Sequence, residues 1–148
     1  MRARNIKPDF FVDEDLATVP FEARILMAGL WCCADKAGRL EDRPLRIRAS
    51  VFPFDAVDVD ALLCLLNKAG KLERYTVKGC KYIQLNTFHK DQNPHHTEKE
   101  SIIPEFNGEV TVKEPSNNGA LTPKIHSNPP DLLITDVGTP NTDSALPA

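Results

Sequence analysis

The stretch Asp58-Val-Asp-Ala-Leu-Leu-Cys-Leu-Leu-Asn-Lys-Ala-Gly70 decides the fold, together with Lys71-Leu-Glu-Arg-Tyr-Thr-Val-Lys-Gly79 and Cys80-Lys-Tyr-Ile-Gln-Leu-Asn86, which follow it directly. The first stretch has the apolar spacing of an amphipathic helix that ends at its glycine. The next two stretches alternate between apolar and polar residues, and Lys78-Gly79 suits a two-residue turn between strands. A helix that leads without a linker into a hairpin is the second half of a winged helix-turn-helix domain. This architecture mostly binds nucleic acid and less often another protein.

The turn also predicts the register of the hairpin. It pairs Val77 with Cys80 and Tyr75 with Tyr82, and places these four residues on one face. We expect that face to be partly exposed. There the two tyrosines would stack on bases, contact a protein partner or pack as an ordinary cross-strand pair. The opposite face suits the domain core because it carries three apolar residues. They are Leu72, Ile83 and Leu85.

Two helices are predicted ahead of the hairpin segment. Residues 18–34 have apolar side chains on nearly every side, which indicates a helix at the buried centre of the domain. After a short extended link at residues 39–42, Asp42 is predicted to cap a second helix with Pro44 near its first turn. The i, i+4, i+7 spacing predicts which residues of that helix face the core. They are Leu45, Ala49 and Phe52.

Three carboxylates lie near the start of the third helix, which is the helix that usually reads bases in this architecture. Asp55 is the predicted N-cap, and Asp58 and Asp60 fall in the first turn, where the helix dipole favours negative charge. Carboxylates repel phosphates, so we do not expect this end of the helix to enter a DNA groove deeply.

The composition changes near residue 98. Residues 1–99 hold 16 lysines and arginines against 14 aspartates and glutamates, whereas residues 100–148 hold 2 against 7. The later part also contains seven of the twelve prolines and, as its one aromatic residue, Phe106. Such a composition buries too little apolar surface to offset chain entropy. We therefore expect an α+β winged helix-turn-helix domain at residues 1–97, with a three-helix core and a C-terminal hairpin wing. Residues 98–148 are expected to form a mostly disordered, acidic, proline-rich tail.

The basic residues of the domain predict contacts with double-stranded DNA. Guanidinium groups suit phosphate because their planar fork donates two parallel hydrogen bonds. Lysines at the tip of the wing carry further positive charge that can contact the phosphate backbone. The predicted phosphate contacts are Arg39, Arg43, Arg46, Arg48, Lys78 and Lys81. The polar groups expected nearest to base edges are Ser50, Asn67 and Lys68. The alternative interpretation is a solvated helix face that Glu41 and Asp42 partly neutralise.

Other functions find little support. No glycine-rich phosphate loop, Ser-His-Asp pattern or paired-carboxylate cleft is present, so we expect neither an enzyme nor a cofactor. The histidines of the His89–His96 segment are too close together for a nuclease-type metal site. The four cysteines form no CxxC pair and suit a reducing compartment. With no signal peptide and no long apolar stretch, a soluble, cytoplasmic protein is expected.

Several stretches between residues 4 and 96, taken in order, resemble the sequences of a known protein family. They are Asn5-Ile-Lys-Pro-Asp-Phe-Phe11, Arg24-Ile-Leu-Met-Ala-Gly-Leu-Trp31, Asp35-Lys-Ala-Gly-Arg-Leu-Glu-Asp-Arg-Pro44, Asp58-Val-Asp-Ala-Leu-Leu63, Tyr82-Ile-Gln-Leu85 and Lys90-Asp-Gln-Asn-Pro-His95. In them the chain resembles small winged-helix replication-initiation, or replisome-organiser, proteins of temperate bacteriophages and prophages, similar to the origin-binding domain of the phage lambda O protein. The resemblance implies DNA binding in replication initiation or its regulation, inside a bacterial host cell, with host replication proteins as further partners.

Two other functions stay open at this point. The net charge of −3 and the acidic start of the third helix also fit a protein-interaction module, for example a phage factor that binds or inhibits a host protein. A transcriptional regulator would need the same kind of DNA-binding surface.

Overall fold

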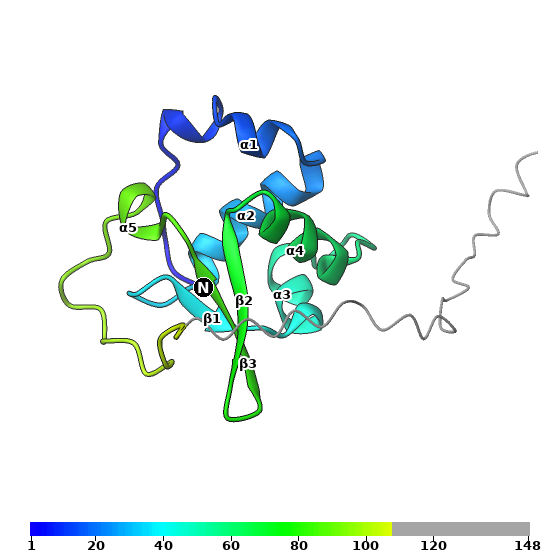
Figure 1. The fold of residues 1–148 in the computed structure, drawn as a ribbon. Helices are drawn as coiled ribbons and strands as arrows, with labels where there is room; N and C mark the ends of the chain where they lie inside the picture. Colours follow the sequence, from blue (N-terminus) through cyan, green and yellow to red (C-terminus); the bar gives the residue numbers. More distant parts are fainter. Residues whose placement is uncertain (108–148) are drawn as a thin grey trace, which may run out of the picture. The chain divides into compact units, whose positions relative to one another are not determined.

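The structure, a computed structural model, describes residues 1–107 and has an α+β fold (Figure 1). The chain begins with a 3₁₀ turn, η1 (Pro8–Phe10), and the short helix α1 (Glu14–Ala17). The longer elements follow in the order α2 (Phe21–Cys33), β1 (Arg39–Glu41), α3 (Pro44–Val51), α4 (Val59–Lys68), β2 (Leu72–Val77) and β3 (Cys80–Leu85). A last turn of helix, α5 (Phe88–Asp91), comes after the hairpin. Three helices followed by a hairpin are compatible with a winged-helix-like fold.

The three strands form an antiparallel sheet in the order β1-β3-β2. The predicted hairpin register is confirmed, because Tyr75 is paired with Tyr82 and Val77 with Cys80. Lys78 and Gly79, at the turn, have φ angles of 50° and 82°, the left-handed conformation that a tight hairpin turn needs at both positions. The link predicted to be extended is strand β1, which completes the sheet. The hairpin projects beyond the helices at one end of the molecule (Figure 1).

The core lies between the helices and one face of the sheet. Leu26 and Leu30 of α2 and Leu63 of α4 are fully buried. The apolar face of the sheet packs on them, as predicted, through Leu72, Ile83 and Leu85, together with Leu40. Helices α2 and α3 approach closely at Gly29, where a Cβ atom would lie 2.6 Å from the side chain of Val51. None of the helices in residues 1–107 combines the length and apolar character that crossing a membrane requires.

The predicted core-facing side of α3 is partly wrong. Phe52, just after the helix, is buried as expected, but Leu45 and Ala49 are exposed. Ile47 is the buried residue within the helix, and Val51 packs against the core one turn later. Ile47 and Val51 are also apolar residues separated by four positions, so the sequence fits this face of the helix as well. The position of α2 decides between the two sets, because its Gly29 leaves room for Val51.

Two predicted helix caps are also wrong. Helix α3 begins after Arg43 without a side-chain cap, and Asp42 instead forms an ion pair with Arg74. At the start of α4 the cap is Asp58, whose carboxylate accepts a hydrogen bond of 3.0 Å from the amide of Ala61. Asp55 lies in the loop before that helix and does not cap it.

Residues 98–107, which we call the strap, contact the body of the domain. Glu98 forms a two-pronged ion pair with Arg4, with distances of 2.5 and 3.0 Å. Farther along, the carbonyl of Pro104 accepts a hydrogen bond of 2.8 Å from the hydroxyl of Tyr75. The domain boundary expected after residue 97 therefore lies before a segment that still packs on the domain. The disorder expected farther along the tail concerns residues 108–148, which lie outside the described residues.

Candidate nucleic-acid interface

A hollow beside α3 and β1 brings together four of the residues that were predicted from the sequence to contact DNA. It has a volume of about 490 Å³, and the strap forms its opposite wall. The four residues are Arg39, Arg43, Arg46 and Ser50. The hollow has a mixed rim, because Arg2 and Lys99 lie there alongside Glu41, Glu100 and Asp35. Cations and carboxylates therefore share this surface, with the cations in excess.

Arg43 and Arg46 are the most exposed arginines of this hollow. Their side chains are 63% and 76% exposed. Both lie near the carboxylate of Glu41, Arg43 at 2.7 Å and Arg46 at 3.9 Å. Exposed pairs of this kind contribute about 0–1 kcal/mol, so a phosphate can compete for either guanidinium. Ser50 is exposed one turn after Arg46 and donates its hydroxyl hydrogen bond to the Arg46 carbonyl.

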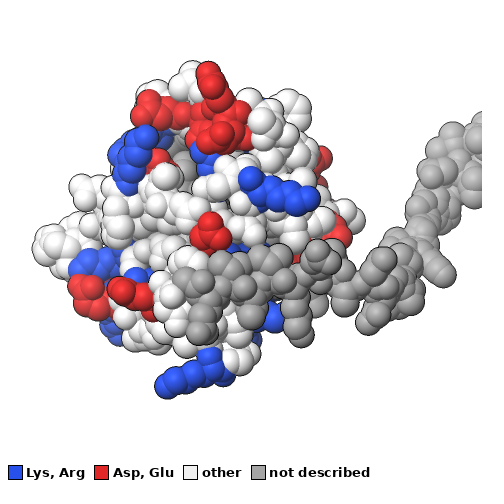
Figure 2. Space-filling model, in the orientation of Figure 1, with Lys and Arg blue, Asp and Glu red and all other residues white. Residues whose placement is uncertain are grey.

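The wing lies next to the start of α3. The amide of Asp42 donates a hydrogen bond of 3.0 Å to the carbonyl of Lys81, so β3 runs beside the residues that lead into the helix. Lys81 and the turn residue Lys78 are both exposed. Figure 2 shows basic side chains at the lower end of the molecule, where the hairpin ends, and acidic side chains gathered at the opposite end over α1, with basic side chains beside them. The end of the hairpin therefore carries positive charge, whereas the opposite end carries charges of both signs, because Lys71 pairs there with Asp13 and Asp15.

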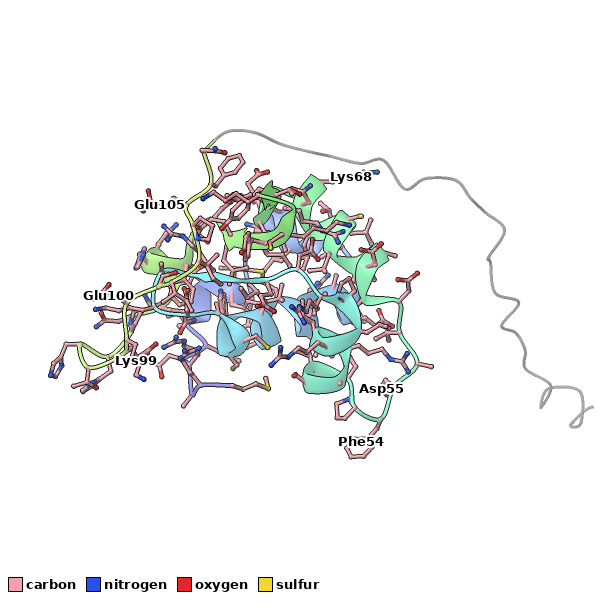
Figure 3. The ribbon with its side chains drawn as sticks, turned by 90° about the horizontal axis from the view of Figure 1, so that it is seen from below. Phe54, Asp55, Lys68, Lys99, Glu100 and Glu105 are labelled. Atoms are coloured by element: carbon pink, nitrogen blue, oxygen red, sulfur yellow. The ribbon has the colours of Figure 1, made fainter. Side chains whose placement is uncertain are left out.

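Three of the expected DNA contacts lie apart from both this hollow and the wing. Arg48, near the end of α3, donates a hydrogen bond of 3.3 Å from Nε to the carbonyl of Asp55. Asn67 and Lys68 are in the last turn of α4, which leads into the start of β2 and not toward the wing tip. Figure 3 shows Lys68 at one edge of the molecule and Asp55 near the opposite edge. The structure therefore does not bring Arg48 and the end of α4 onto one surface.

Arg39 has a different environment from the other arginines. Its side chain is only 14% exposed. Nε donates to Gln84 at 3.0 Å, Nη1 to the carbonyl of Ile103 at 3.0 Å, and Nη2 to Glu105 at 2.9 Å. The guanidinium is therefore fully engaged by the sheet and the strap. A duplex backbone would have to displace the strap to reach it.

The expectation of a partly exposed tyrosine face is wrong for Tyr75. This residue is 1% exposed, and its ring contacts both Tyr82, at a centroid distance of 5.7 Å, and Phe106, at 5.5 Å. Burial is the main cause that raises the pKa of Tyr75 above its ordinary value. Tyr82 is less buried. The sequence did not reveal this arrangement because the covering residues come from the strap, which was assigned to the tail.

An ion-pair network centred on Arg74 was not predicted from the sequence. Its guanidinium contacts Asp42 at 2.7 and 2.9 Å and Asp60 at 2.6 Å. Burial lowers the pKa of Arg74, but the hydrogen bonds that the guanidinium donates to the two carboxylates outweigh this effect and raise the pKa above its usual range. The network ties β2 to the start of α4 and to the link before α3. The available signal was an arginine on the core-facing side of the predicted hairpin.

The pair of Glu98 with Arg4 predicts a pH dependence of stability. The hydrogen bond from Arg4 is the main cause that lowers the pKa of Glu98 below its ordinary value of 4.5. A lowered pKa in the folded state stabilises the fold above that ordinary value, and the contribution is lost as the pH falls through the lower, folded-state pKa. We expect Glu98→Gln to lower the free energy of unfolding by about 1 kcal/mol at pH 7 and by progressively less as the pH falls below 4.5.

Urea unfolding of both proteins at several pH values measures this difference. Glu100→Gln is the matched control, because Glu100 is an exposed strap carboxylate that pairs with Lys36. The pH dependence of its stability should match that of the unmodified chain. A Glu98→Gln deficit that stays constant down to pH ~3 would contradict the assignment.

Histidines and cysteines do not form a metal centre in the part of the chain that the structure describes. Within residues 1–107, no group of three or more His, Cys, Asp or Glu side chains is arranged to hold an ion. The rings of His95 and His96 pack on each other at 4.2 Å, and His95 contacts Thr97. The four cysteines, Cys32, Cys33, Cys64 and Cys80, are free thiols.

Comparison of the chain with models of protein families, with curated proteins and with solved structures finds no match.

Proposed function

We propose that this chain is a winged-helix protein that binds double-stranded DNA in phage replication initiation or its regulation. The order of three helices and a hairpin supports the fold, and the resemblance noted in the sequence supports the role. The single observation that carries DNA binding is the exposure of Arg43, just before α3, and Arg46, within α3, beside the strand that bears Lys81. The proposed role requires no catalysis.

The contact mode follows from this geometry. Helix α3 approaches a duplex with its first two turns, and Arg43 and Arg46 bind phosphates while Ser50 lies nearest to the base edges. The wing places Lys78 and Lys81 along the backbone beside the same segment of DNA. Asp60, at the start of α4, is paired with Arg74, which offsets the repulsion between its carboxylate and a phosphate. Affinity then comes mostly from phosphate contacts and depends steeply on salt.

Fluorescence anisotropy with a labelled random-sequence duplex, at several salt concentrations, tests the proposal. We expect R43Q/R46Q to bind about tenfold more weakly at low salt, with a slope of log affinity against log salt that is smaller by about 2. K68Q/K90Q is the matched control, because it removes two exposed positive charges away from the wing tip. Equal losses in the two double variants, or no binding by the unmodified chain at low salt, would reject the proposal.

A protein-interaction module is the second candidate, and the exposed apolar residues favour it. Phe21 and Ile25 on α2 and Phe54 in the loop after α3 are all exposed. Figure 3 shows Phe54 projecting from the edge of the molecule. Purification from a bacterial host with and without nuclease separates the two functions. A stoichiometric protein partner that survives nuclease treatment, and that Phe54→Ser abolishes, would favour this second function.

A further inference from the structure

The sheet face opposite the helices carries one guanidinium and two tyrosine rings side by side. Arg39 comes from β1, Tyr82 from the central strand β3 and Tyr75 from β2. The two rings are 5.7 Å apart. Helices cover the other face of this sheet, so these three residues occupy a surface that the helical core does not use.

Arg39 is held in place by Gln84, its partner on β3, which lies on the same face of the sheet. Its Nε donates to the side-chain oxygen of Gln84, and the amide nitrogen of Gln84 donates in turn to the carbonyl of Ala37 at 3.1 Å. Both terminal nitrogens of the guanidinium are left for acceptors outside the sheet. Such a planar pair of donors matches two oxygens of one anionic group, phosphate included.

The strap now occupies this surface with a carboxylate followed by an aromatic ring. Glu105 pairs with Nη2 of Arg39 at 2.9 Å, and Phe106 packs its ring on Tyr75 at 5.5 Å with an interplanar angle of 60°. A nucleotide offers the same succession, a phosphate followed by a flat base. The Glu105 side chain is 81% exposed, so water and competing anions reach this ion pair.

We propose that this sheet face is a binding site for single-stranded nucleic acid and that the strap is its built-in competitor. A phosphate replaces the carboxylate of Glu105 on Arg39, and a base replaces Phe106 beside Tyr75 and Tyr82. Bases stack well on aromatic rings whatever their sequence, which suits a site built from two tyrosines. The strap competes at high effective concentration because it belongs to the same chain.

A single strand fits this surface better than a duplex does. Bases in a duplex are stacked on each other, and their faces are not available to a tyrosine ring. Glu41 and Glu73 lie on the same face of the sheet, on the outer strands. Their carboxylates would repel the phosphates of a strand that extends farther across the sheet. The site should therefore hold only a few nucleotides. It uses other residues than the proposed duplex contact of α3 and the wing, and it does not depend on that proposal.

The test uses the full chain and a labelled ten-nucleotide oligothymidine in fluorescence anisotropy. Weakening the strap raises the fraction of molecules with an open site, and the apparent affinity rises by the same factor. We expect E105Q/F106A to bind about tenfold more tightly than the unmodified chain. E100Q/I102A is the matched control, because it removes one carboxylate and one apolar side chain from the exposed part of the strap. Its affinity should be unchanged.

Two further sets of variants test whether the gain in affinity comes from the sheet face. Adding R39Q/Y82A to E105Q/F106A should abolish the gain, whereas adding R43Q/R46Q should leave most of it. If the control gains as much as E105Q/F106A, or if the gain survives R39Q/Y82A, the proposal is overturned. Thermal unfolding checks each variant, and Glu105→Gln alone, with a smaller gain expected, replaces the double variant if that one unfolds. Duplex affinity measured in parallel should change little, and an equal gain for duplex would also overturn the proposal.

Discussion

Replacement of Arg74 by methionine is expected to lower the free energy of unfolding by about 3 kcal/mol. The substitution keeps a long side chain but leaves Asp42 without its partner, and the Asp42 side chain is only 4% exposed. A buried charge whose partner is removed costs about 3–5 kcal/mol. The lower end of that range applies because Asp60, the other partner, is largely exposed and can return to water.

Urea unfolding followed by the fluorescence of Trp31 measures the loss, since Trp31 is the single tryptophan and lies in the core. Arg46→Met is the control: it removes an exposed arginine with a loose ion pair, and should change stability by less than about 0.5 kcal/mol. The double variant D42N/R74M should lose less than the sum of the two single variants, because the neutral amide no longer needs the guanidinium. Additive losses would show that the two residues act independently.

Replacement of Gly38 by alanine is expected to lower the free energy of unfolding by about 3 kcal/mol, for two separate reasons. Gly38 has a φ of +78°, where a side chain costs about 1–2 kcal/mol. An added Cβ would also lie 2.6 Å from the Phe88 ring, and overpacking of a core costs about 1–3 kcal/mol. Phe88 is buried, so its ring has little room to move away.

Gly70 and Gly79 separate the two causes. They have φ angles of +73° and +82°, and a Cβ added at either would meet nothing within 4 Å. Gly70→Ala and Gly79→Ala should therefore lose only the backbone contribution, about 1–2 kcal/mol. If Gly38→Ala is no worse than these two, the contact between the turn before β1 and α5 does not limit stability. Thermal or urea unfolding of the three variants gives the comparison.

Features that depend on neighbours in the chain could be predicted from the sequence. The hairpin register followed from Lys78 and Gly79, because two successive residues in the left-handed conformation leave a single alignment of the strands. The end of α4 near Gly70 and the extended link at β1 followed from equally local signals. The core-facing side of the sheet was also correct, because alternation assigns every second residue to the same face.

The face of α3 could not be predicted as safely. An eight-residue helix contains only about two turns, so two apolar spacings fitted it equally well. The spacing chosen placed Leu45 in the core, whereas the close approach of α2 at Gly29 selected Ile47 and Val51. A helix as short as this one takes its orientation from its neighbours more than from its own pattern.

The charged groups also show a difference between what the sequence predicts and what packing decides. All the basic residues proposed to bind nucleic acid could be picked out by type, but their partners were hidden. Arg74 pairs with Asp42 across 32 positions of the chain, and Arg39 pairs with Glu105 across 66. Arg39 and Tyr75 were expected to face solvent because the strap that covers them had the composition of a disordered tail.

The order of the helices and the hairpin, the strand register and the supply of positive charge were thus determined by the amino-acid sequence alone. The tertiary structure decided which of those charges face solvent and which are held by carboxylates. It also decided that the aromatic face of the sheet is covered. The reason is physical: turns and alternation act between adjacent residues, whereas ion pairs and burial depend on distant segments that meet only when the chain packs.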